Sequence, residues 1–406
     1  MAASLSRVVR YAFAAVALAG AYFCFVFARA SYLFQQDTAA SVPAAVRLAP
    51  YDGSYVARLA GWQPDKKIGL LHRAVELNPF DADSWIQLGL AAEMEQRDTA
   101  AAERYYLQAS KVDRMFLPRW TLTNFYFRQE RSSEFFLWAK ASLQITPYPA
   151  DPVFAQMWLM SQDPQRIAAC VPDRPGILLQ YASFLANAHQ YEFVAPVVKR
   201  LTIATTGRNP VEYGRDDQIG PLEDRLLAAG DVEPALEIWK SLNQARWIAL
   251  AAPTPAHPIT NGDFRVPLFE HGFDWQFLNS SGLTVEQAPD QHSLRIAFSG
   301  DEAEHCVLLQ EYVPLDPNRA YRLSWTAEAS GLESPSGITW QVHPIGEEKQ
   351  ISLVAGDLLS GPEGTWDFQS PNGSKLSLLT LEYTRPAGQV RANGSVVLQQ
   401  VSMQER

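Results

Sequence analysis

The hydrophobic residues in the first part of the chain recur with the period of an α-helix. Within residues 81–113, the inward positions fall at i, i+3, i+4 and i+7, which places them on one helix face. These positions are Trp85, Leu88, Gly89 and Ala92. A second helix in the same stretch carries Ala102, Tyr106 and Ala109 on its inner face. Neither helix can bury its apolar face alone, so further helices are expected to stack on this pair.

The helical pair recurs along the chain. In three places a turn residue stands six positions before the first apolar residue of a new helix. The pairs are Pro79 and Trp85, Arg114 and Trp120, and Pro147 and Val153. A period of about 34 residues, together with Trp85, Leu88 and Gly89, resembles the tetratricopeptide repeat. Ala92 stands where that family has Tyr. The resemblance implies an all-α helical-repeat domain over residues 54–249 that binds a protein partner.

After residue 259 the hydrophobic pattern changes to the alternation of β-strands. Apolar side chains occupy every second position in several short runs that Gly, Pro, Asn and Asp separate. The clearest runs are 292–298, 321–327, 338–342, 376–383 and 395–403. Because no helix-length pattern lies between them, the sequence predicts an antiparallel β-sandwich. Residues 250–258 contain three prolines and are predicted to form an extended linker before this domain.

The predicted β-domain, residues 259–406, resembles the jelly-roll carbohydrate-binding modules of the galactose-binding type. The segments that carry the resemblance are 259–264, 272–275, 310–315, 320–325 and 395–401. The resemblance implies a two-sheet sandwich that binds a glycan. In this family the closing strand usually carries an acidic residue that helps to hold a structural calcium. Gln399 and Gln400 stand at that place here, so no cofactor is predicted.

Candidate glycan-binding residues follow from the way that sugars are bound. Sugar rings stack on aromatic side chains while polar neighbours bind the hydroxyls. Trp275, whose neighbours in the sequence are Asp274 and Gln276, lies near a predicted turn. Trp366 lies near another predicted turn. The candidate ligand-binding residues are therefore Trp275, Trp366, Asp274 and Gln276. Trp340 shares its predicted strand face with apolar residues and is expected in the core.

The N-terminus has the pattern of a membrane-insertion segment. Arg7 and Arg10 precede an apolar run, residues 11–28, that contains no charge before Arg29. The run approaches the ~20 residues that cross a bilayer. Because the cations precede the run, the N-terminus is predicted to stay in the cytoplasm and the bulk of the chain to lie outside it.

Residues 1–30 are therefore predicted to be a cytoplasmic stub and a transmembrane signal anchor, and residues 31–53 a tether or a short amphipathic helix that leads into the repeats. The alternative is a signal peptide that is cleaved after Ala30. Ala28-Arg29-Ala30 has the small-x-small form of a cleavage site, which supports this alternative.

The composition and the motifs of the sequence argue against several classes of function. The net charge is −10 and the cations form no cluster, which argues against nucleic-acid binding because phosphate binding needs concentrated positive charge. The sequence has no phosphate-binding loop, nucleophile elbow, zinc-protease motif or dinucleotide fingerprint. His72 and Glu76 stand at i, i+4, where an ion pair is the favoured interpretation over a metal site. No catalytic residue and no metal ligand is predicted.

These features predict a multidomain α plus β protein that is a non-catalytic adaptor or scaffold. The family resemblances place it in the inner membrane of a bacterium, with a role in envelope polysaccharide assembly or export. Two alternatives stay open. One is a glycan-processing enzyme with an accessory β-domain, and the other is a structural assembly factor that does not bind glycans.

Overall fold

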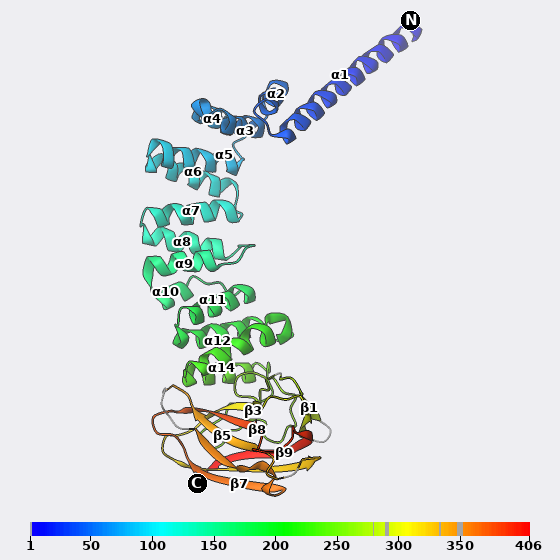
Figure 1. Cartoon of the computed structure of the whole chain (residues 1–406). Coiled ribbons are helices and arrows are strands. Elements are labelled where there is room, and N and C mark those ends of the chain that lie inside the picture. The colour runs from blue at the N-terminus through cyan, green and yellow to red at the C-terminus, as the bar shows by residue number, and fades with distance from the viewer. Residues whose placement is uncertain (1, 279, 289–291, 333, 347–351) are drawn as a thin grey trace. The chain divides into compact units, whose positions relative to one another are not determined.

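The computed structural model describes residues 2–278, 280–288, 292–332, 334–346 and 352–406. The chain forms two compact units (Figure 1). The first contains the residues up to Pro149 together with Leu159–Ser161, and the second contains Ala150–Trp158 and Gln162–Arg406. The predicted fold class, a helical region with an apolar N-terminal helix followed by an antiparallel two-sheet sandwich, is confirmed.

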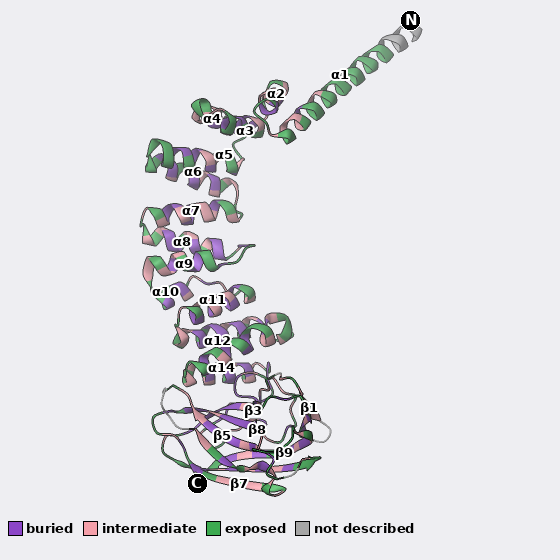
Figure 2. Ribbon diagram, in the orientation of Figure 1, coloured by how far each residue is buried: buried purple, intermediate pink, exposed green. Residues whose placement is uncertain are grey.

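The first unit begins with one long helix, α1, which spans Ala2–Gln36. Its segment Val9–Gln36 is long and apolar enough to cross a membrane, a property that membrane anchors and signal sequences share. Most of its described length is exposed (Figure 2). Residues 31–53 are mostly helical, because α1 continues through the first of them and the short helix α2, Ser41–Leu48, follows, so the helical alternative fits this segment and the tether does not.

The last turns of α1 are fixed to the helices that follow. The Phe34 ring stacks on Tyr55 of α3, Gly53–Trp62, with centroids 4.4 Å apart. The carboxylate of Asp37 accepts hydrogen bonds from the side chains of Arg58 and Trp62. These contacts join α1, α2 and α3 into one corner, which periodicity could not reveal because the contacts form between separate helices.

The rest of the first unit consists of successive helices that pack on their neighbours. They are α4 (Lys67–Leu77), α5 (Ala82–Leu90), α6 (Thr99–Val112), α7 (Phe116–Arg128) and α8 (Ser132–Leu143). A π-helical turn, Ala91–Gln96, extends α5. The close approach of α5 and α6 depends on Gly89, because a β-carbon there would lie 2.3 Å from the Tyr106 ring.

The second unit contains further helices, followed by the sandwich. The helices are α9 (Asp151–Ser161), α10 (Pro164–Ala168), α11 (Pro175–Asn187), α12 (Val194–Ala204), α13 (Gly220–Ala228) and α14 (Val232–Gln244). The last three residues of α9 belong to the first unit. Helix α12 packs on α11 and on α14.

Two antiparallel sheets form the sandwich, with the strand orders β1-β2-β9-β4-β7 and β3-β8-β5-β6. The strands are β1 (Leu283–Ala288), β2 (Ser293–Ser299), β3 (His305–Pro314), β4 (Ala320–Ser330), β5 (Ile338–Pro344), β6 (Leu353–Asp357), β7 (Glu363–Gln369), β8 (Leu376–Thr384) and β9 (Asn393–Glu405). Alternation places Tyr321, Leu323 and Trp325 of β4 in the core between the sheets. The same rule leaves Arg322 and Ser324 on the outer face.

The segment between α14 and the sandwich packs against α14. Asn243 donates a hydrogen bond to the Leu250 carbonyl at 2.9 Å, and the Trp239 indole donates to Ala251 at 3.2 Å. Trp239 is completely buried and meets the Phe273 ring edge-on at 5.7 Å. The first residues of the predicted linker, Leu250 and Ala251, are thus held against α14, and the boundary at 250–258 stays a prediction.

Candidate functional site

Trp275, the first predicted ligand-binding aromatic, lies in the core of the sandwich. Its side chain is completely buried. The indole nitrogen donates to the Asn261 carbonyl at 3.2 Å, and the ring centroid lies 6.0 Å from that of Trp340. Because a stacking ring must expose a face, Trp275 does not offer one to a sugar in this structure. Its role is packing, as the sequence predicted for Trp340.

Asp274 is also buried, and it holds the opening segment of the sandwich together. Its Oδ2 accepts from the Phe269 amide at 2.6 Å, and its Oδ1 accepts from the Asn261 side chain at 3.4 Å. Burial raises the pKa of Asp274 to about 6, against the opposing effect of these hydrogen bonds. The carboxyl therefore stabilises the opening segment of the sandwich and is not exposed to a ligand.

Gln276 connects the sandwich to α13. Its Nε2 donates to Asp224 Oδ1 at 2.9 Å, and its Oε1 accepts from Gln310 Nε2 at 3.0 Å. Asp224 also accepts from the Gly272 amide and contacts the His271 ring, both at 2.7 Å. The polar groups of Gln276 are therefore engaged in an interface within the second unit.

Trp366 is the predicted aromatic that is partly exposed, and it packs against the edge of the sandwich core. It lies on β7, an edge strand of the five-stranded sheet, and it is half-buried. The ring stacks on Phe368 with centroids 4.6 Å apart. The neighbouring Asp367 binds Arg322 at 2.7 Å and Arg406 at 2.7 Å. The four predicted residues therefore do not form one site, because Gln276 bridges to β3 and Trp366 lies on the other sheet.

A polar cluster that the sequence did not indicate lies on the four-stranded sheet. Glu382 Oε1 lies 2.9 Å from His343 Nε2, and its Oε2 lies 2.9 Å from His305 Nε2. Thr380 donates to Glu382 at 2.8 Å, and His343 Nδ1 lies 2.6 Å from the Ser352 hydroxyl. Burial alone would raise the pKa of Glu382, but the hydrogen bonds from Thr380, His343 and His305 outweigh it and lower the pKa.

This His305–Glu382–His343 cluster faces away from the core. Leu381 and Tyr383 on β8 are core residues, so Glu382 between them points to the outer face. The Glu382 side chain is only 7% exposed, whereas that of His305 is 61% exposed. The cluster thus presents hydrogen-bonding groups to solvent, while its carboxylate lies below the surface. Among the described residues, no group of three or more His, Cys, Asp or Glu side chains is arranged to hold a metal ion.

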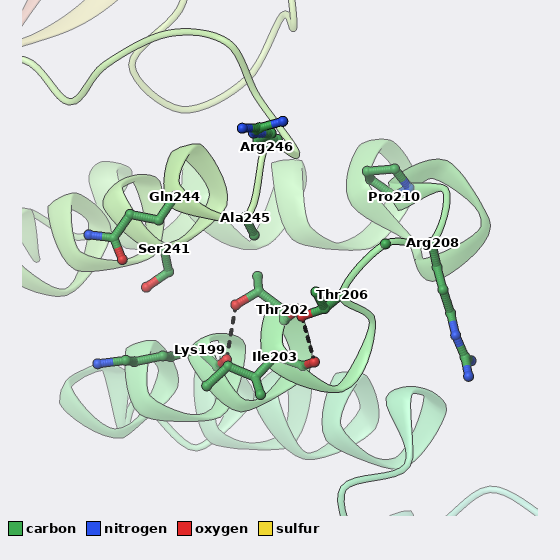
Figure 3. Close-up of a pocket in the computed structure, with 11 residues that line it drawn as sticks. Lys199, Thr202, Ile203, Thr206, Arg208, Pro210, Ser241, Gln244, Ala245 and Arg246 are labelled. Atoms are coloured by element: carbon green, nitrogen blue, oxygen red, sulfur yellow. Dashed lines mark hydrogen bonds between the residues drawn. The ribbon is translucent and has the colours of Figure 1, made fainter.

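A cavity of about 650 Å³ lies between the C-terminal ends of α12 and α14 (Figure 3). Lys199, Arg208 and Arg246 are among its lining residues. Figure 3 shows the Lys199 side chain extending to the left and the Arg208 side chain extending downward, so the two do not point toward each other. The hydroxyl groups of Thr202 and Thr206 donate to carbonyls of their own helix. The polar groups therefore do not converge on one ligand.

No protein-family model matches the chain, and no curated protein matches it either. A solved structure described as "CBM4 structure and function" is 12% identical, covers 36% of this chain and 99% of its own, and has a TM-score of 0.27. Another, described as "BiXyn10A CBM1 APO", is 14% identical and covers 31% of this chain and 82% of its own at a TM-score of 0.22. The enzymatically active domain of tailspike protein 4 from bacteriophage CBA120 is 12% identical over 38% of this chain and 22% of its own, with a TM-score of 0.28. Similarities at these TM-scores do not support an argument about function.

Proposed function

We propose that the chain is a non-catalytic adaptor anchored in the inner membrane of a bacterium, with its bulk outside the cytoplasm. Its helical region, which resembles tetratricopeptide repeats, binds a protein partner. Its sandwich binds a glycan of the cell envelope. This function fits a role in polysaccharide assembly or export.

The observation that carries the glycan proposal is the half-exposed ring of Trp366. The ring is held flat against Phe368, so its orientation is fixed before a ligand arrives. Asp367, the next residue on β7, points with Arg322 and Arg406 to the opposite face of the sheet. Sugar recognition uses an exposed aromatic ring together with hydrogen-bonding side chains, and the edge strand β7 offers the ring.

Titration of the full-length protein in nanodiscs with envelope oligosaccharides tests this proposal, with bound ligand detected by calorimetry. Trp366→Ala is expected to weaken binding by ~1–3 kcal/mol, the scale of one aromatic contact. Glu382→Gln and His343→Ala are expected to change affinity only if the ligand reaches the second sheet. Tyr148→Ala, an exposed aromatic of the helical region, is the control. A wild type that binds none of a broad panel would favour the structural alternative, and release of shortened sugars would favour the enzyme.

Exposed apolar residues at the turns between helix pairs support the protein-binding role. Phe80, Met115 and Tyr148 precede α5, α7 and α9, and their exposed fractions are 80%, 69% and 63%. They occupy corresponding places in successive helix pairs, so the apolar positions recur with the repeat. Such recurring contacts suit an extended polypeptide partner.

Photo-crosslinking in intact cells tests the protein-binding role. A crosslinking amino acid at Phe80 or Tyr148 is expected to capture the same partner, identified by mass spectrometry. The same substitution at Val390, which is 88% exposed in the sandwich, is the matched control. If all three positions capture the same background proteins, the helical region has no specific partner at these turns.

The local structure around Ala30 supports an uncleaved anchor. Cleavage after Ala30 would cut α1 inside the helix, next to a residue that is completely buried. We expect the mature protein to keep residues 1–30 and to resist extraction from membranes by alkaline carbonate. Intact mass measurement checks this, and a soluble species beginning at Ser31 would mean that the segment is a signal peptide.

A further inference from the structure

A cleft of about 480 Å³ lies between α1 and the turn that joins α2 to α3. Residues of α1 from Tyr22 to Phe27 form one wall, and residues 48–52 form the other. We propose that this cleft binds one acyl chain of a phospholipid in the outer leaflet. The proposal rests on the membrane anchor proposed above.

The position of the cleft along α1 places it at membrane depth. The apolar run ends at Ala28, and Tyr22 precedes that end by six residues, or about 9 Å at 1.5 Å per residue. The turn at residues 48–52 therefore lies beside the last turns of the apolar run, not beyond them. When α1 crosses the bilayer, this turn reaches the boundary between acyl chains and headgroups.

The walls of the cleft have the chemistry of that boundary. Tyr22, Phe23 and Phe27 are 65%, 58% and 60% exposed, and Tyr51 on the opposite wall is 84% exposed. Exposed aromatic residues at this depth are typical of the interface between acyl chains and water. An acyl chain in the cleft would cover apolar surface that the described chain itself leaves open.

The cleft is also preformed, and two cations flank the turn that forms one of its walls, to which Asp52 also contributes. The corner formed by α1, α2 and α3 holds the two walls in place through the Phe34–Tyr55 stack. Arg73 donates to the Pro50 carbonyl at 3.2 Å, which places a guanidinium at the turn. Arg47 is exposed in the last turn of α2. A phosphate above an acyl chain would meet these cations, which favours a phospholipid over an uncharged apolar ligand.

Native mass spectrometry of the full-length protein, released from nanodiscs of phosphatidylethanolamine and phosphatidylglycerol, tests the proposal. The wild type is expected to retain one phospholipid. Val26→Trp fills the cleft with a ring and is expected to reduce the retained fraction at least fivefold. Val16→Trp makes the same change at a position on α1 that is 71% exposed and away from the cleft, and it should retain lipid as the wild type does.

Arg73→Gln is expected to reduce retention of phosphatidylglycerol while leaving the protein inserted. Equal retention by wild type and Val26→Trp would overturn the proposal, as would a dimer mass that disappears in Val26→Trp, because a second copy would then occupy the cleft. Carbonate extraction of the same samples distinguishes a failure of the proposed membrane anchor from a failure of the proposed lipid site. A protein that is extracted lacks the anchor, whereas one that stays inserted without retained lipid lacks only the lipid site.

Discussion

One buried carboxyl group of the first unit and two of the second are accommodated in different ways. In the first unit, Glu93 lies in the π-helical turn after α5 and is 9% exposed. It accepts hydrogen bonds from the Tyr106 hydroxyl at 2.9 Å and from Arg128 at 2.9 and 2.8 Å. This carboxylate is matched by a cation and a hydroxyl, so its charge is compensated inside the fold.

In the second unit, Glu223 of α13 is completely buried, and so is Glu311 of β3, which contacts Thr260 in the opening segment of the sandwich. Among the described residues, neither oxygen of Glu223 and only one oxygen of Glu311 has a hydrogen-bond partner. Burial raises the pKa of both groups well above its usual range, and Asp224 and Asp274 add repulsion to Glu223 and Glu311 respectively. Burial therefore favours the neutral, protonated form of these carboxyls in the folded protein.

The comparison shows that a fold can bury an acidic side chain either by pairing it or by keeping it neutral. Pairing makes the site sensitive to loss of its partner. Neutralisation makes the site sensitive to pH. The first unit should thus be disrupted by removing an arginine, and the junction of α13 with the sandwich should be disrupted by alkali.

The largest effect is expected from Arg128→Ala, which leaves Glu93 buried beside Tyr106 alone. Breaking a buried pair costs ~3–5 kcal/mol. Arg131→Ala is the matched control, since Arg131 is similarly exposed but its partners Glu103 and Glu134 are more open than Glu93. It should cost ~0–1 kcal/mol. Urea unfolding in detergent, followed by circular dichroism, measures both, and equal losses would contradict the comparison.

A smaller effect is expected from Gly89→Ala, at the same buried site. The new β-carbon would lie 2.3 Å from the Tyr106 ring that binds Glu93. Overpacking of this kind costs ~1–3 kcal/mol. Gly69→Ala in α4 is the control, because no described residue lies within 4 Å of its β-carbon position. That change should stabilise the helix by up to ~1 kcal/mol, and thermal unfolding of the two variants should move in opposite directions.

The junction should lose stability as pH rises. A carboxyl whose pKa is raised on folding contributes its full stability below the unfolded pKa of about 4.5, and loses it as pH rises toward the folded pKa. Each such group reduces the free energy of unfolding by up to ~1.4 kcal/mol per pH unit in that window. Unfolding monitored by tryptophan fluorescence from pH 4.5 to 8 measures the slope.

Glu223→Gln should flatten this slope, because an amide does not titrate. Glu304→Gln is the control, since Glu304 is exposed and pairs with Arg385 on the surface. The slope of the control should match that of the wild type. An unchanged slope in Glu223→Gln would mean that Glu223 is not neutral in the folded protein.

The smallest effect is expected at the His271–Asp224 pair, which is partly exposed. The hydrogen bond to Asp224 raises the pKa of His271, so the stability from this pair is present below pH 6.5 and disappears as pH rises through the folded pKa. Because solvent screens the pair, His271→Gln should cost no more than ~1 kcal/mol at pH 5.5 and less at pH 8.5. The free energy of unfolding of the wild type and of His271→Gln, measured at these two pH values, checks the sign of this pH dependence.

Tryptophan positions illustrate how far sequence reasoning can go. Trp275 and Trp366 both lie near predicted turns, and nothing local distinguishes them. The structure buries Trp275 completely and leaves Trp366 half-exposed. Burial depends on what packs from distant segments, here Trp340 on β5 and Phe264 before the first strand. The tetratricopeptide resemblance and the domain boundary at 250–258 stay predictions.

The sequence by itself determined the order and type of the elements. An apolar N-terminal run, a helical period and then strand alternation specify α1, the helices up to α14 and the two-sheet sandwich. These patterns can be read locally because each helix or strand must turn one apolar face inward.

Only the tertiary structure decided which polar residues meet. His305, His343 and Glu382 come from β3, β5 and β8, and they meet because β8 pairs with both other strands in one register. A shift of one residue would turn Glu382 into the core and Leu381 outward. Strand register is set by long-range packing, and the same is true of the α13 junction that buries Glu223. The physical reason is that local periodicity determines which face of its helix or strand a residue occupies. The residues that it meets on that face come from distant parts of the chain.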